Sequence, residues 1–150
     1  MDLSMISPFK RRSRERGHAV IELSLMAPWL FFLMVGTLDF GFYSYAMIAT
    51  ENAARVAVVQ TARDSLTVAD STLACQYALQ ELNTLSNANT LTTCDALPVT
   101  VTAASVVDAD GATASQVSVT YQTINMIPIP GLTGTLTLTR TAQMRLRQQP

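Results

Sequence analysis

The sequence predicts an α+β fold in which a long N-terminal helix precedes a short second helix and a three-stranded antiparallel sheet. Three patterns predict it: a long apolar run near the N-terminus, apolar residues at helical spacing between positions 67 and 85, and three Thr- and Val-rich stretches that alternate in the last third of the chain. The chain has 150 residues. Once a membrane helix is set aside, its globular core must be small.

Composition points to a membrane protein. Hydrophobic residues make up 49% of the chain and charged residues only 14%, against about 25% charged in soluble proteins. Five of the ten basic residues lie in the first sixteen positions: Lys10, Arg11, Arg12, Arg14 and Arg16. Because this basic segment directly precedes the apolar run, we interpret it as a topology signal that keeps the N-terminus cytoplasmic, and we expect no nucleic-acid binding.

The apolar run extends from Ala19 to Thr50 and contains only two charged residues, Glu22 and Asp39. Sixteen uncharged residues separate these carboxylates, fewer than the ~20 needed to span a bilayer. We therefore place the transmembrane part at about residues 20–45. Aromatic side chains favour the headgroup region, so the far membrane interface is predicted at Asp39, Phe40, Tyr43 and Tyr45.

Other kinds of apolar segment fit less well. A cleavable secretory signal needs only ~7–15 apolar residues, and the nearest cleavage-like sequence, Ser44 to Ala46, comes late. A lipoprotein needs a cysteine just after the run, whereas the first cysteine is Cys75. A plain signal anchor without further processing explains length, flank and orientation, and it stays open.

A plain anchor does not explain Gly17 at the end of the basic segment and Glu22 five residues later. A carboxylate costs ~2.5 kcal/mol or more at the membrane centre and less near the interface, which suggests a task or a partner. Further along stand Ala27-Pro28, Asp39-Phe40-Gly41 and Asn52-Ala53-Ala54-Arg55. Over roughly residues 10–63 this combination resembles the TadE-like proteins, minor pilins or pseudopilins of the tight-adherence (Flp) pilus machinery.

The resemblance implies a pilin-like fold and cleavage by an inner-membrane prepilin peptidase between Gly17 and His18. The chain then divides into a basic leader, 1–17, an N-terminal helix, 18–63, and an extracytoplasmic domain, 64–150. The implied role is structural, in assembly of a Tad (Flp) type IV pilus or its secretion apparatus. The implied partners are the peptidase, other pilins or pseudopilins, the assembly platform and membrane lipid. The implied location is the inner membrane with the domain in the periplasm; entry into a surface pilus is left open.

Two residues of the apolar run have a physical interpretation. Cleavage would create an α-amino group beside lipid, and the Glu22 carboxylate, one turn away, can neutralise it in its own or a neighbouring chain. The alternative is that Glu22 lies near the headgroups and has no role. Pro28 removes a backbone donor and predicts a kink. Asp39 is interpreted as an interfacial residue, with a subunit contact left open.

Past the membrane we expect the helix to continue to about Arg63. Four alanines at spacings of three and four share one face and are predicted to pack against the chain's own domain: Ala46, Ala49, Ala53 and Ala57. Glu51 and Arg55, four apart, form a predicted surface pair of only ~0.3–0.5 kcal/mol.

The second helix is predicted over Thr67–Leu85, with Thr67 followed by Asp70 as its start signal. Strands are predicted at Val99–Val107, Gln116–Ile124 and Thr135–Leu146, with a turn at Asp108–Gly111 between the first two. The apolar connection Met126–Gly131 holds two prolines. It either forms a partner-binding tip or folds back over the core.

Cys75 and Cys94 are the only cysteines. Outside the reducing cytoplasm we expect them to be disulfide-bonded, and neither has the spacing or the histidine companions of a metal site. His18, the only histidine, lies at the membrane boundary, so the outer domain lacks a nucleophile–histidine arrangement. We therefore expect no enzyme activity and no cofactor. The alternative function is an unprocessed, single-pass binding or scaffold protein of the cell envelope.

Overall fold

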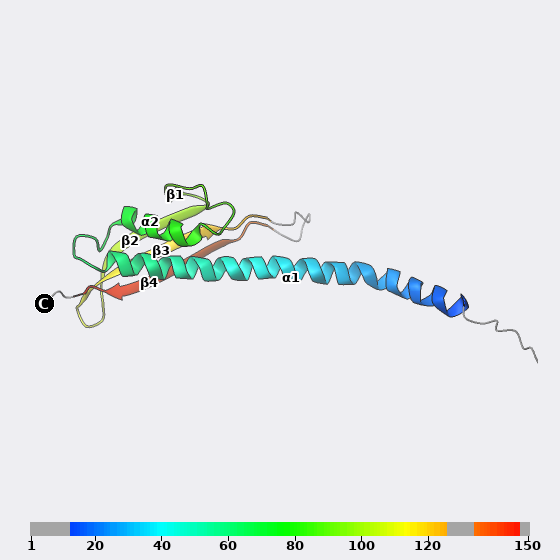
Figure 1. Cartoon of the computed structure of the whole chain (residues 1–150). Helices are drawn as coiled ribbons and strands as arrows, with labels where there is room; N and C mark the ends of the chain where they lie inside the picture. Colours follow the sequence, from blue (N-terminus) through cyan, green and yellow to red (C-terminus); the bar gives the residue numbers. More distant parts are fainter. Residues whose placement is uncertain (1–12, 126–133, 148–150) are drawn as a thin grey trace, which may run out of the picture. The chain divides into compact units, whose positions relative to one another are not determined.

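The computed structural model describes residues 13–125 and 134–147. It contains two helices and four strands in that part of the chain, and it confirms the α+β class (Figure 1). In order these are α1 (Ser13–Thr61), α2 (Ser71–Leu82), β1 (Asp95–Ala96), β2 (Val99–Val107), β3 (Thr113–Gln122) and β4 (Thr137–Arg145). The predicted loop Met126–Gly131 lies outside the described residues.

Helix α1 is shared between two compact units, one ending at Leu38 and the other beginning at Asp39. In the first unit the side chains from His18 to Leu38 are exposed, apart from the partly buried Val35. A stretch of α1 has a mean hydropathy of 1.9 with none of it buried, and α1 is long and apolar enough to cross a membrane. The helix continues through Pro28. A helix that is apolar on all sides and exposed needs lipid or protein around it.

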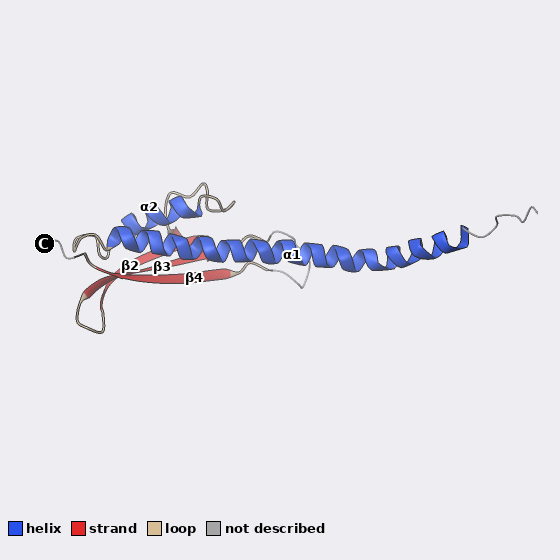
Figure 2. Ribbon diagram, turned by 60° about the horizontal axis from the view of Figure 1, so that its bottom comes forward, coloured by secondary structure: helices blue, strands red, loops and turns tan. Residues whose placement is uncertain are grey.

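In the second unit, the C-terminal part of α1 and all of α2 lie on one face of the sheet (Figure 2). The four predicted alanines of α1 are buried, Ala46, Ala53 and Ala57 completely and Ala49 to 8% exposure. All four belong to the hydrophobic core of the domain. The predicted packing of this face against the chain's own domain is confirmed.

The start of α2 differs from the prediction. Asp70, not Thr67, is the N-cap: its carboxylate accepts hydrogen bonds from the backbone N–H groups of Thr72 (2.9 Å) and Leu73 (3.0 Å). The Thr67 hydroxyl instead donates to the carbonyl of Thr61 at 2.9 Å, within the turn that follows α1. Thr67 therefore closes the turn after α1, and the helix begins four residues later than expected.

The sheet has four antiparallel strands in the order β1-β2-β3-β4, not three. The missed strand, β1, has two residues, too few to show alternation in the sequence. The bounds of β2 agree with the prediction, whereas β3 starts earlier, at Thr113, and β4 is shorter at both ends. In β3 the inward residues Val117, Val119 and Tyr121 are fully buried, as the alternation predicted.

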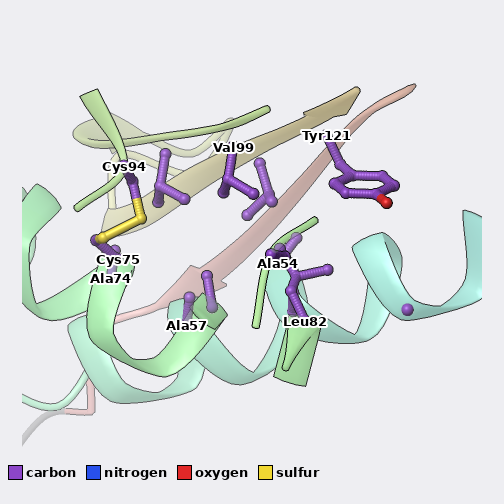
Figure 3. Close-up of a cluster of buried hydrophobic side chains, with 14 of the residues drawn as sticks. Ala54, Ala57, Ala74, Cys75, Leu82, Cys94, Val99 and Tyr121 are labelled. Carbon is purple, nitrogen blue, oxygen red and sulfur yellow. A yellow bond between two sulfur atoms is a disulfide. The ribbon is translucent and has the colours of Figure 1, made fainter. Parts of the chain in front are cut away.

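The core is a thin layer between the two helices and the sheet (Figure 3). Ala54 and Ala57 of α1 and Ala74 and Leu82 of α2 contribute to it, with Tyr121 on β3 as the largest fully buried side chain. Most helix residues here are alanines, so the area buried per residue is modest.

Tyr121 anchors the loop after α2. Its hydroxyl donates to the side-chain oxygen of Asn87, and the Asn87 amide donates to the carbonyl of Gln122 at 2.9 Å. Burial raises the pKa of the Tyr121 phenol, so the hydroxyl stays protonated and remains a donor. The polar loop at residues 86–90 is thereby held against the sheet.

The turn between β2 and β3 is closed by its own backbone and by β4. The N–H of Asp108 donates to the Ala112 carbonyl at 2.8 Å, and Gly111 has φ +83°, a conformation that favours glycine. Arg145 donates to Asp108 (2.7 Å) and Asp110 (2.9 Å). The hydrogen bond from Arg145 holds the pKa of the Asp108 carboxyl below its usual value, so this pairing is lost only when acidification passes that lowered pKa.

The predicted disulfide is present: Cys75 on α2 is bonded to Cys94, one residue before β1, with their Cα atoms 5.8 Å apart. Their sequence separation of 19 corresponds to a closed loop whose constraint stabilises the folded chain by roughly 3 kcal/mol.

Replacing both Cys75 and Cys94 by alanine should lower the free energy of unfolding by about 3 kcal/mol, because the unfolded chain regains the freedom of that loop. Chemical denaturation of the full chain in detergent micelles, monitored by circular dichroism, measures the difference. Alkylation supplies the control: unreduced, denatured wild-type protein should take up no alkyl group, and two after reduction. Ready alkylation of both thiols before reduction would contradict the bond.

Candidate functional site

The residues that the sequence singled out lie along α1. Gly17 and His18 fall within its backbone, which is helical from Ser13. A peptidase acting on this bond requires the helix to unwind locally. Gly17 and His18 are the fifth and sixth residues of α1, just past the first four, whose N–H groups have no helical partner. Helix ends fray by one or two residues, so unwinding this close to the end costs little. The described structure is therefore compatible with cleavage there only if the helix end opens.

Glu22 lies on the exposed surface of α1 among exposed apolar residues such as Ile21 (64% exposed) and Leu23 (64%). Among the described residues no side chain forms a hydrogen bond or ion pair with it. Positions 18 and 22 are four apart and so share one face of the helix. The geometry thus places the Glu22 carboxylate on the same face as the position that would become the N-terminus.

Asp39 is buried, although the sequence predicted an interfacial residue. Its side chain is only 8% exposed, and no described residue forms a hydrogen bond with its Oδ1 atom. An unpaired carboxylate oxygen in a buried position destabilises the fold. Asp39 is also the first residue of the second compact unit.

The aromatic residues predicted at the membrane interface differ in their surroundings: one side chain is largely exposed, and two form hydrogen bonds with the domain. Phe40 is 72% exposed. Tyr43 donates to the carbonyl of Gly134 at 3.1 Å, and Tyr45 donates to the Thr84 hydroxyl at 2.8 Å. Both tyrosine hydroxyls thus fasten α1 to distant parts of the domain. Sequence reasoning missed these partners because neither lies near in the chain. A membrane-interface position for these residues stays a prediction.

Between His18 and Leu38 the first unit therefore presents an exposed apolar helix with one carboxylate, Glu22. The second unit contains the following turns of α1 as part of its core. We compared this arrangement with known proteins. Residues 17–58 match the family model described as TadE-like protein.

The TadE-like segment, residues 17–58, begins at the leader glycine and includes Glu22, Pro28, Asp39 and Arg55, four residues of the predicted resemblance. The match confirms that resemblance for this segment, which is under a third of the chain. It indicates a pilin-like protein associated with a Tad pilus, and TadE-like proteins are structural components of that machinery. No curated protein and no solved structure matches the chain.

The TadE-like segment covers more than a membrane anchor. It includes the exposed apolar part of α1 and also the buried alanine face at residues 46–57. The family pattern therefore covers the part of α1 that packs against the sheet as well as the part suited to lipid. Within residues 18–125 and 134–147, His, Cys, Asp and Glu side chains form no group that could hold a metal ion.

Asp39→Asn should raise the free energy of unfolding by roughly 1 kcal/mol, because an amide is less costly to bury than an unpaired carboxylate. Thermal unfolding of the full chain in detergent micelles at neutral pH measures this. Glu81→Gln makes the same chemical change at an exposed position and should leave the midpoint unchanged. Destabilisation by Asp39→Asn would show that the charge contributes favourably to the folded state.

Proposed function

We propose that this protein is a minor pilin or pseudopilin that takes part in assembly of a Tad (Flp) type IV pilus or its secretion apparatus. The observation that carries the proposal is the TadE-like match over a segment that is an exposed apolar helix at one end and the domain's core helix at the other. Such a helix suits a subunit that is inserted in a bilayer before assembly and packs among the apolar helices of other subunits afterwards. The role is structural and involves no catalysis or cofactor.

In this proposal the basic residues before Gly17 stay in the cytoplasm and the disulfide-bonded domain lies in the periplasm. The charge bias of the flank supports that orientation, and the Cys75–Cys94 bond supports an oxidising compartment. The partners are a prepilin peptidase, other pilins or pseudopilins, the assembly platform and membrane lipid.

Cleavage between Gly17 and His18 distinguishes this function from that of an unprocessed membrane-anchored scaffold. Gly17→Leu should block cleavage almost completely, because a large side chain next to the cut bond crowds the peptidase site. Intact-mass measurement of membrane-extracted protein, from cells with an active prepilin peptidase, reports whether the chain starts at His18 or Met1.

Gly36→Leu is the matched control, since a Cβ atom added at Gly36 meets nothing within 4 Å. This variant should be cleaved like wild type. Wild-type protein that keeps its leader under these conditions would support the scaffold function instead.

The second test concerns Glu22, whose carboxylate has no partner among the described residues. If it neutralises the new α-amino group of a neighbouring subunit, Glu22→Ala and Glu22→Gln should insert into the membrane normally. Both should reduce co-purification with other pilus components by about tenfold, the effect of losing ~1.4 kcal/mol from a charge pair.

Glu81→Ala is the control, because it removes an exposed carboxylate that lies on α2 and not on the apolar part of α1. It should co-purify like wild type. If both Glu22 variants form pili and co-purify normally, the result would favour the alternative in which Glu22 lies near the headgroups and has no role in assembly.

A further inference from the structure

Strand β4 forms a free edge of the sheet. Among the strands at residues 13–125 and 134–147 it pairs only with β3. Two hydrogen bonds, one at each end of β4, show which of its residues face β3. The N–H of Leu146 donates to the Thr113 carbonyl, and the N–H of Thr123 donates to the Leu136 carbonyl. Residues facing the partner alternate in an antiparallel ladder, so the even-numbered residues of β4 face β3. The backbone groups of Thr139, Thr141 and Gln143 therefore point away from the sheet.

These outward groups are largely unused. In the described part of the chain, the backbone N–H groups of Thr139, Thr141 and Gln143 have no acceptor. The Thr139 carbonyl accepts one long bond of 3.4 Å from the Arg140 guanidinium. The edge thus offers a row of alternating donors and acceptors, which is the template that an added strand requires.

The opposite edge of the sheet is covered. Strand β1 pairs with the first two residues of β2. Further along β2, the N–H of Val101 donates to the Cys94 carbonyl at 3.2 Å and that of Ala103 to the Ser71 hydroxyl at 3.0 Å. The fold therefore satisfies the outward donors of β2 from Val99 to Ala103, whereas the described residues offer no acceptor to those of β4 at Thr139, Thr141 and Gln143.

A groove of about 710 Å³ runs beside the free edge. One wall is α1 and the other is β4; its lining residues are Glu51, Ala54, Arg55, Val58, Val59, Arg140, Thr141, Ala142, Gln143 and Met144. The apolar members include Val59, which is 40% exposed. An extended chain paired to β4 would point alternate side chains toward this apolar surface and the others toward solvent.

Charge indicates what the groove accepts. Arg145 is paired with two aspartates and Arg55 with Glu51. Arg140, also in the groove, has no carboxylate partner among the described residues: besides the Thr139 carbonyl it contacts the Met47 sulfur at 3.1 Å. A partly buried guanidinium with such weak acceptors favours a carboxylate brought in by the occupant.

A second copy of β4 is a poor occupant. In a fully overlapping antiparallel pair, Thr141 would lie opposite Thr141 of the other copy. The two Arg140 side chains would then be diagonal neighbours, within reach of each other's like charge. We propose that the free edge of β4 is a strand-addition site for an extended segment of another protein that carries an acidic residue opposite Arg140. This inference does not depend on cleavage at Gly17 or on the pilus role.

The test uses the full chain in detergent micelles and a fluorescent peptide of 9 residues, the length of β4. The peptide has Thr at its odd positions, Val at positions 2, 4 and 8, and Glu at position 6, which a full antiparallel overlap with β4 places opposite Arg140. Fluorescence anisotropy should show saturable binding, and hydrogen exchange at Thr139, Thr141 and Gln143 should slow by about tenfold or more as their N–H groups become bonded. A peptide with N-methylated alternate residues, which cannot complete the ladder, should not bind.

Thr141→Pro removes the central outward donor and should weaken binding at least ~10-fold, while the pairing with β3 is kept because that N–H does not take part in it. Thr141→Val keeps the N–H and is the matched control. Arg140→Gln should weaken binding of the Glu peptide about tenfold, and it should hardly change binding of a peptide with Gln in place of that Glu. Gln143→Pro provides a second edge variant if Thr141→Pro melts at a lower temperature than wild type.

Three results would overturn the proposal. The first is an absence of saturable binding to the wild-type chain. The second is binding that survives N-methylation of the peptide and both proline substitutions. The third is self-association of the wild-type chain that Thr141→Pro abolishes, which would make a second copy the occupant.

Discussion

The structure depends on one constraint: a single helix must satisfy two surroundings along its length. From His18 to Leu38 α1 is apolar on nearly all sides and its side chains are exposed. From Ala46 onward it is amphipathic, with small residues on the buried face and Glu51 and Arg55 on the exposed face. The second part contributes small residues to the core of the domain, where its buried face consists mainly of alanines.

That constraint limits the core of the domain. Alanine side chains bury little apolar area, so hydrophobic burial alone stabilises the domain modestly. A disulfide and a few buried polar contacts add to its stability. The Cys75–Cys94 bond restricts the unfolded chain, and Tyr121 with Asn87 ties the loop after α2 to the sheet. Thr61 and Ser115 add a buried hydroxyl pair, 2.7 Å apart, between the end of α1 and β3. Each joins elements that are distant in the sequence.

Polar groups without strong hydrogen-bond partners are concentrated in a few places of the described structure. The outward face of the sheet is uncharged in its central rows, where Thr120 and Thr139 lie 3.0 Å apart and Thr141 donates to Ser118. The groups that lack a strong hydrogen-bond partner among the described residues are the Asp39 oxygen, the Arg140 guanidinium and the outward backbone of β4. Of these, only the Asp39 oxygen is a buried atom without a partner among the described residues. The β4 groups lie on exposed residues, where water or an added strand can reach them.

The sequence by itself determined the features that rest on local patterns. The exposed apolar helix, the alanine face, the alternating β3 strand, the turn at Gly111 and the Glu51–Arg55 pair follow from periodicity and spacing, which a linear chain displays directly. The TadE-like segment was likewise recognisable from Gly17, Glu22 and the residues after them. The two cysteines limited the disulfide to one intramolecular pairing.

Tertiary structure decided what depends on distant partners. Asp70 caps α2, and Thr67 lies in the turn after α1, where its hydroxyl donates to the Thr61 carbonyl. β1 is too short to have a pattern of its own and exists only because β2 lies beside it. Asp39 is buried, and Tyr43 and Tyr45 are bonded to Gly134 and Thr84, because the folded domain covers that turn of α1. The free edge of β4 was likewise invisible in the sequence, since alternation shows which face a side chain takes but not which strands lie on either side.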